Sequence, residues 1–116
     1  MKKYIDTGKV DTRSGFGEGL AIAGREDDRV LALTADLKGS LKMGAFAKAF
    51  PERFIQCGIA ESNMVGVAAG LAITGKVPFI GSFAEFVTGR VYDQLRQEVA
   101  YGHTNVKIAS SHAGIT

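Results

Sequence analysis

The chain has little cysteine and proline and no tryptophan: of its 116 residues, one is a cysteine, Cys57, and two are prolines. A single cysteine excludes an internal disulfide, which suits a reducing compartment, so we expect a cytoplasmic protein. No apolar run approaches the roughly 20 residues of a membrane span, and 1–10 holds none that fits a signal peptide. The net charge of +2 is too small, and the basic residues are too scattered, to predict binding to nucleic acid or to an anionic membrane.

What the chain does have is a regular alternation of short apolar runs and helical patterns. The runs of strand length are 30–34, 54–57, 77–81 and 106–109. The helical patterns are 12–24, 44–50, 61–74 and 85–101. This alternation predicts an α/β domain: a doubly wound, mostly parallel sheet with helices on both faces. We expect a single domain, 12–116, after an amino-terminal extension, 1–11.

The segment after the fourth predicted strand, 110–116, contains neither a covering helix nor a polar tail. A parallel sheet would be left partly uncovered there. We therefore expect that the sequence is a piece of a longer protein, or that a partner covers this side.

The most informative segment is 54–61, in which a short apolar strand stops at Gly58 and leads to Glu61 in the first turn of a helix. Ligands of parallel sheets bind beyond the carboxyl ends of the strands. A carboxylate at that place, among small apolar residues, is a candidate for proton chemistry. An acidic residue in a first helical turn also simply offsets the helix dipole. From these residues alone both interpretations stay open.

Several details of the helices carry further expectations. The Gly66-x-x-x-Gly70 spacing predicts close packing within or between subunits. Arg90, Asp93 and Arg96 are predicted to share one face of the helix 85–101, where they either bridge a subunit contact or form solvated pairs. Cys57 has no histidine or second cysteine at a readable spacing, so we interpret it as a small buried filler.

The order of the motifs resembles one known family. The motif stretches are 57–61 (CGIAE), 66–72 (GVAAGLA), 79–83 (FIGSF), 92–94 (YDQ), 36–40 (DLKGS) and 111–114 (SHAG). Together they are similar to the pyrimidine-binding domain of transketolase, and in particular to the start of the carboxyl-terminal subunit of a split transketolase. The resemblance extends over 12–116. The glycine-plus-glutamate motif alone is shared with other thiamine diphosphate enzymes.

The resemblance implies a thiamine diphosphate-dependent transferase of the pentose phosphate pathway, which moves a two-carbon ketol unit between phosphorylated sugars. Glu61 matches the glutamate that hydrogen-bonds N1′ of the cofactor's aminopyrimidine ring. Phe83 and Phe86 match positions that pack against this ring, where an aromatic floor would exclude water. Asp36 matches a residue near the thiazolium ring and the subunit contact. Without the resemblance, its position alone would indicate a turn or helix cap.

The resemblance also implies substrate-binding residues. Arg13 and Ser40 match positions that bind the sugar phosphate, and His112 matches a histidine of the substrate channel. Arg13 is unusual for its place because a cation in a first helical turn opposes the helix dipole. A guanidinium aimed at phosphate would explain it, whereas a solvated surface arginine is the alternative. Glu61 and His112 are thus the predicted catalytic residues, and no role is predicted for His103.

Parts of the family's site have no counterpart in this sequence. The family holds the diphosphate and its magnesium or calcium with a Gly-Asp-Gly run and an asparagine, which belong to a partner domain. The resemblance therefore implies no metal ligand in this chain. We expect the chain to be inactive alone and to act with the diphosphate-binding subunit of the same enzyme, as a dimer or another homo-oligomer or hetero-oligomer.

Other functions compete with transketolase. The chain is also compatible with an enzyme like deoxyxylulose phosphate synthase, with a β subunit of a 2-oxoacid dehydrogenase, or with a non-catalytic assembly module. A nucleotide-binding loop at 15–19 is disfavoured because its glycines lie inside a helical pattern and not after a strand.

Overall fold

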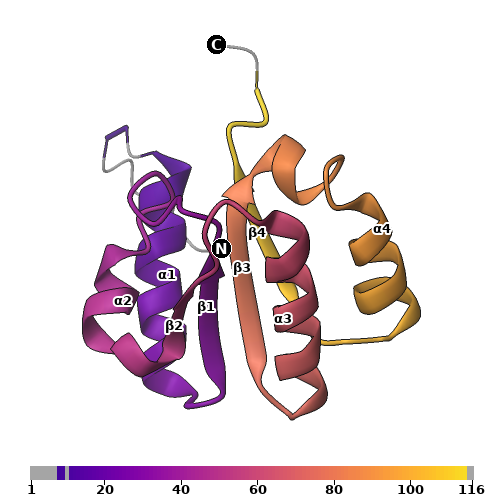
Figure 1. The fold of residues 1–116 in the computed structure, drawn as a ribbon. Coiled ribbons are helices and arrows are strands. Elements are labelled where there is room, and N and C mark those ends of the chain that lie inside the picture. The colour runs from indigo at the N-terminus through magenta and orange to yellow at the C-terminus, as the bar shows by residue number, and fades with distance from the viewer. Residues whose placement is uncertain (1–7, 10, 115–116) are drawn as a thin grey trace, which may run out of the picture.

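The computed structural model describes residues 8–9 and 11–114, which form one parallel sheet with helices on both faces (Figure 1). The strands are β1 (Val30–Thr34), β2 (Phe54–Gln56), β3 (Val77–Phe83) and β4 (Lys107–Ser111). The helices are α1 (Thr12–Glu26), α2 (Gly44–Ala49), α3 (Glu61–Ile73) and α4 (Tyr92–Gln94). Shorter turns are the 3-10 helices η1 (Pro51–Arg53) and η2 (Ala84–Val87), and α4 continues as the π-helix η3 (Leu95–Tyr101). Most of the predicted extension 1–11 lies outside the described residues, so this boundary stays a prediction.

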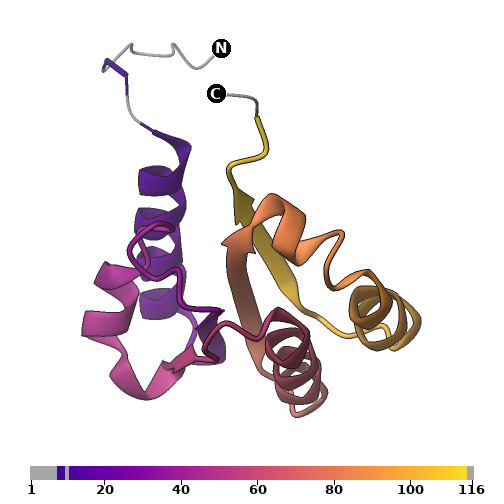
Figure 2. The same cartoon turned by 45° about the horizontal axis from the view of Figure 1, so that its top comes forward.

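The predicted α/β class is confirmed: the strand order is β2-β1-β3-β4, and every neighbouring pair is parallel. Helices α1 and α2 cover one face, while α3 and the α4–η3 segment cover the other (Figure 2). Strand β1 divides its side chains between the two faces, as a period of two requires. Val30 and Ala32 belong to the core under α1 and α2, and Leu31 and Leu33 to the core under α3.

Helix α1 continues past the predicted end at Gly24 to Glu26, so the predicted end of this helix is wrong. Gly24 has a packing role instead. A Cβ there would lie 2.5 Å from the Phe46 ring and 2.8 Å from the Phe50 ring. Glycine at this position lets α1 approach the α2 region closely.

The single helix predicted over 85–101 is also wrong. Residues 84–87 form a 3-10 turn, 88–91 form turns, and helical structure resumes only at Tyr92. Thr88 and Gly89 are weak helix formers, and the backbone N–H of Arg90 donates to the carbonyl of Glu85 at 3.1 Å. Four apolar side chains of this segment nevertheless face the core: Val87 and Val91 are fully buried, and Leu95 and Val99 pack beside them.

The two glycines of α3 have different surroundings. A Cβ on Gly66 would lie 3.2 Å from the carboxylate of Glu98 on η3, whereas one on Gly70 would meet no atom within 4 Å. The close packing predicted for this spacing therefore occurs within the chain at Gly66, and the Gly70 side is open.

Strand β4 is the most exposed strand, as the sequence led us to expect for this edge. Ile108 is 44% exposed at its centre. Among the described residues, the structure contains no helix that is both long and apolar enough to cross a membrane.

Candidate functional site

The strand order brings together loops that are far apart in the sequence. The segments following β1, β2 and β3 meet at the carboxyl end of the sheet, which is where parallel sheets bind ligands. They enclose a pocket of about 190 Å³, which we call the Glu61 pocket. Its lining residues are Ala35, Asp36, Leu37, Ile59, Glu61 and Phe86. Three of the residues predicted for the cofactor, Asp36, Glu61 and Phe86, therefore lie in one cavity.

Glu61 is the first residue of α3, and only 4% of it is exposed. Its carboxylate oxygen Oε1 accepts a hydrogen bond from Nη1 of Arg90 at 3.0 Å, and the two form an ion pair. Within residues 8–9 and 11–114, the structure records no donor for the second oxygen, Oε2. The carboxylate thus has one oxygen paired with a cation and one available to the pocket.

Arg90 is a residue whose contact the sequence reasoning missed. It lies in the turn before α4, so it does not share a helical face with Asp93 and Arg96, and that prediction is wrong. Its guanidinium carbon lies 3.8 Å from the centre of the Phe86 ring. The signal that could have suggested this turn is the adjacent Gly89, which weakens a helix at this point.

Asp36 follows β1 with a positive φ of 59°, a left-handed conformation that is uncommon outside glycine and is adopted by aspartate more readily than by most other residues. Its backbone N–H donates to the side-chain oxygen of Gln56 at 2.7 Å, and the N–H of Gly58 donates to the same oxygen at 3.3 Å. Gln56 therefore ties the loop after β1 to the loop after β2. Sequence reasoning also missed this contact, since it joins two loops 20 residues apart.

Phe83 ends β3 and does not line the Glu61 pocket. Its ring centre lies 5.8 Å from that of Phe86 and 4.2 Å from that of His112. Phe83 thus connects Phe86 to the residue that follows β4. The packing of Phe83 directly against a cofactor ring stays a prediction.

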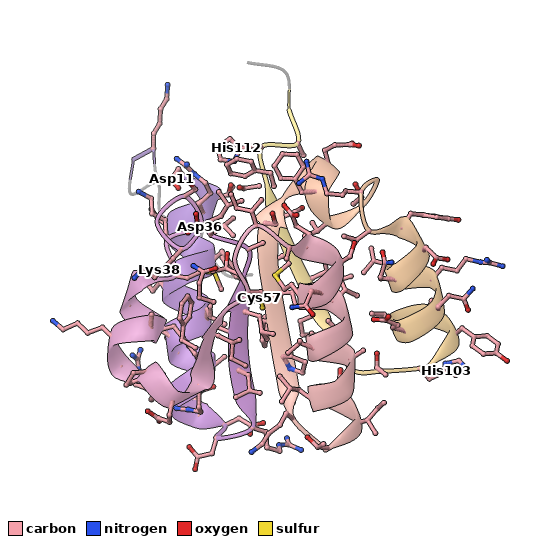
Figure 3. The ribbon with its side chains drawn as sticks, in the orientation of Figure 1. Asp11, Asp36, Lys38, Cys57, His103 and His112 are labelled. Atoms are coloured by element: carbon pink, nitrogen blue, oxygen red, sulfur yellow. The ribbon has the colours of Figure 1, made fainter. Side chains whose placement is uncertain are left out.

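A second hollow, of about 280 Å³, is lined by Thr12, Arg13, Ser111 and His112, and we call it the His112 pocket. Asp36 and His112 both lie at the upper end of the sheet in Figure 3, whereas His103 lies at the far end. The Nδ1 atom of His112 is 2.7 Å from the hydroxyl of Ser111. The structure therefore brings together two of the predicted substrate residues, Arg13 and His112.

Arg13 lies close to Ser40, but the contact is not with the serine hydroxyl. Nη1 of Arg13 donates to the backbone carbonyl of Ser40 at 3.5 Å, the long limit of a hydrogen bond. Nε of Arg13 lies 3.4 Å from the Asp11 carboxylate. The joint binding of a phosphate by Arg13 and Ser40 stays a prediction.

Asp11 explains why a cation is tolerated in the first turn of α1. Its carboxylate caps the helix by accepting hydrogen bonds from the N–H of Ser14 at 2.9 Å and from the Ser14 hydroxyl at 3.0 Å. The backbone bond from Ser14, and then the hydroxyl bond, lower the pKa of Asp11 below its usual value. The anion at the cap offsets both the helix dipole and the charge of Arg13.

Cys57 is partly buried beside the α3 core, and its N–H donates to the carbonyl of Thr34 at 2.9 Å. Burial raises the pKa of its thiol, which makes the reactive thiolate scarcer. Among the described residues, no group of three or more histidine, cysteine, aspartate or glutamate side chains is placed to hold a metal ion.

Comparison with known proteins connects this geometry to a family. Residues 8–116 match the family described as "Transketolase, pyrimidine binding domain". The chain is 51% identical over 104 residues to a putative transketolase C-terminal section from Methanocaldococcus jannaschii, covering 90% of this chain and 33% of that protein. It is 42% identical over 117 residues to human transketolase, covering all of this chain and 18% of the human protein.

Solved structures agree with the sequence relatives. A split gene transketolase, solved as an inactive beta4 tetramer, superposes with a TM-score of 0.82 at 48% identity, covering 90% of this chain and 35% of the other. The transketolase from Leishmania mexicana gives a TM-score of 0.80 at 25% identity, and the superposition covers 96% of this chain and 18% of the other. The chain thus spans about a third or less of these relatives. It belongs to the family of transketolase pyrimidine-binding domains.

Proposed function

We propose that this chain supplies the pyrimidine-binding part of a thiamine diphosphate-dependent transketolase, which transfers a two-carbon ketol unit between phosphorylated sugars. One observation carries the proposal: in a chain of this family, a buried glutamate with one available oxygen shares a pocket with an aromatic ring at the carboxyl ends of three strands.

The residues of the Glu61 pocket fit the aminopyrimidine end of thiamine diphosphate. Glu61 Oε2 is an acceptor for a ring-nitrogen proton, and Phe86 offers a flat apolar surface to a flat heterocycle. When bound, thiamine diphosphate supplies the nucleophilic carbon that makes and breaks the bond beside a sugar carbonyl. Glu61 would hold and exchange a proton at Oε2, in a site dry enough to strengthen the hydrogen bond.

The diphosphate and its magnesium or calcium would be held by a partner subunit, so that the active site forms between subunits. An exposed apolar side chain in the Glu61 pocket and a separate apolar hollow support this part of the proposal. Ile59 lines the pocket and is 78% exposed. An open apolar hollow of about 600 Å³ adjoins α4 and η3, lined by Thr88, Gly89, Tyr92, Leu95, Arg96 and Ala100. Contiguous exposed apolar surface of this kind is typical of contact with another protein.

We assign the His112 pocket to the sugar phosphate. Arg13 supplies a planar cation that suits a phosphate, and His112 lies within the same hollow to contact the sugar. The single cysteine suits a reducing cytoplasm, and sugar phosphates of the pentose phosphate pathway suit the phosphate-binding role. We propose an assembly in which two such sites form in a dimer of catalytic units.

The test is to reconstitute the full polypeptide that contains this chain with its diphosphate-binding partner. Calorimetry should detect thiamine diphosphate binding with magnesium by the mixture, and ketol transfer to aldose phosphates should require both subunits. Decarboxylation of pyruvate would instead favour the synthase or dehydrogenase class. Tight partner binding without cofactor retention would favour a non-catalytic assembly module.

A further inference from the structure

Arg90 contacts two walls of the Glu61 pocket without lining the pocket itself. Its guanidinium donates to Oε1 of Glu61 at 3.0 Å and lies 3.8 Å from the centre of the Phe86 ring. The lining of the pocket includes Glu61 and Phe86 but not Arg90. The arginine therefore supports the carboxylate and the aromatic surface from outside the cavity.

The contact restricts which oxygen of Glu61 can exchange a proton. A guanidinium stays protonated in proteins and only donates hydrogen bonds. Oε1, which accepts from Arg90, therefore cannot carry a proton directed at the arginine. Since no donor among the described residues reaches Oε2, that oxygen is the one left for a ring nitrogen.

The contact also restricts the rotation of the carboxyl group. The terminal torsion of a glutamate is broad and only roughly two-fold, so α3 alone does not fix the plane of the carboxylate. A charge-assisted bond to one oxygen fixes that plane, and packing on Phe86 limits the movement of the guanidinium. The Arg90 side chain is 47% exposed, so solvent screening weakens the ion pair. The Glu61 side chain, in contrast, is only 4% exposed.

We propose that Arg90 is a positioning residue for proton exchange, which holds Oε1 of Glu61 so that Oε2 is directed at the ring nitrogen of the cofactor. The inference rests on the proposed function. It assigns Arg90 no contact with the sugar, so its loss acts on cofactor binding and turnover and not on sugar binding.

The test uses the reconstituted two-subunit enzyme with three variants: Arg90→Ala, Arg90→Lys and the control Arg29→Ala. Arg29 forms an arginine–carboxylate pair with Asp27 at 2.8 Å, just before β1 and therefore at the opposite end of the sheet. The measurements are calorimetric affinity for thiamine diphosphate, near-ultraviolet circular dichroism of the bound cofactor, and kcat and KM for both sugars. Melting curves establish whether each variant is folded. If Arg90→Ala does not fold, the comparison is made with Arg90→Lys.

For Arg90→Ala we expect kcat to fall about tenfold and the affinity for thiamine diphosphate to weaken about threefold, with unchanged KM for the sugars. The circular dichroism of the bound cofactor should change. Added guanidinium ion should restore part of kcat in Arg90→Ala but not in Arg29→Ala. Arg90→Lys should lie between the wild type and Arg90→Ala because it keeps the charge without the planar fork.

Failure of the proposed function and failure of the proposed role of Arg90 would give different results. A wild-type assembly that binds no thiamine diphosphate overturns the proposed function, and this inference with it. A wild-type assembly that binds cofactor and transfers ketol units, together with an Arg90→Ala enzyme of unchanged kcat, affinity and circular dichroism, overturns only the role of Arg90. A rise in sugar KM at constant kcat would also overturn it, because that result would place Arg90 on the substrate.

Discussion

The Glu61 pocket and the His112 pocket lie at the same end of the sheet but are built differently. The first is formed by the ends of three strands around a buried carboxylate that already has a charged partner. The second is formed by the first turn of α1 and the end of β4, and His112 is exposed in it. A buried, paired group is in position before its ligand arrives, whereas exposed side chains must be ordered on binding. We therefore expect changes in the first pocket to reduce turnover and changes in the second to weaken substrate binding.

The largest effect is expected from Glu61→Gln. The amide keeps the shape of the side chain but cannot exchange a proton, so kcat for ketol transfer should fall about 100-fold or more at nearly unchanged sugar KM. Steady-state kinetics of the reconstituted enzyme measures this. Glu52→Gln is the control, because Glu52 is an exposed glutamate before β2, at the other end of the sheet. Full activity of Glu61→Gln would remove the proposed mechanism.

A smaller and different effect is expected from Arg13→Met. Loss of the guanidinium should raise KM for the phosphorylated donor about tenfold with little change in kcat. An unphosphorylated ketose tested on the same enzyme should show no such change. An equal rise in KM for both sugars would mean that Arg13 does not bind the phosphate. The expected difference between the two pockets would then be contradicted.

Gly17→Ala tests whether a change in packing near the His112 pocket leaves the Glu61 pocket unaffected. A Cβ at Gly17 would lie 2.2 Å from the carbonyl oxygen of Lys42, so α1 must move away from the turn that carries Ser40. We expect the free energy of unfolding to fall by about 1–3 kcal/mol and KM for the phosphorylated donor to rise, at unchanged cofactor affinity. Chemical denaturation and calorimetry measure the two effects.

The matched control for this variant is Gly19→Ala, two residues further along the same helix. A Cβ there would meet nothing within 4 Å. Alanine should therefore stabilise the helix by about 0.5–1 kcal/mol. If the two variants lost the same stability, contact with Lys42 would not be the cause.

The smallest effect is expected at the far end of the sheet, in the exposed pair of Asp27 and Arg29. Hydrogen bonds from Arg29 lower the pKa of Asp27 from 3.8 to about 2. Because the folded-state pKa is the lower one, the stabilisation is present above pH 3.8 and is lost as the pH falls towards about 2. Melting temperatures of the wild type and Asp27→Asn should differ slightly at neutral pH and converge near pH 2. A difference that grows on acidification would contradict this assignment.

Local patterns were enough to predict most helices and strands and the position of Glu61 at the start of a helix. Apolar runs of strand length and the helix that begins at Glu61 depend on neighbouring residues, and β1 has the bounds predicted for it. Gly24 and the helix 85–101 were mispredicted for different reasons. The packing of α1 against the Phe46 and Phe50 rings depends on residues distant in sequence, whereas the break at 88–91 coincides with the weak helix formers Thr88 and Gly89, whose local signal was missed. The contacts of Gln56 and Arg90 could not be predicted either, since they depend on the order of strands in the sheet.

The left-handed backbone at Asp36 and His112 has a consequence for protein engineering. Each residue has a φ of 59°, a conformation that costs on the order of 1 kcal/mol for a side chain other than glycine. A screen for heat resistance would therefore tend to select glycine at these two positions, because it relieves that cost. Such variants would survive heating better while losing a polar side chain from the Glu61 pocket or from the His112 pocket, so stability would be gained at the expense of the proposed catalysis.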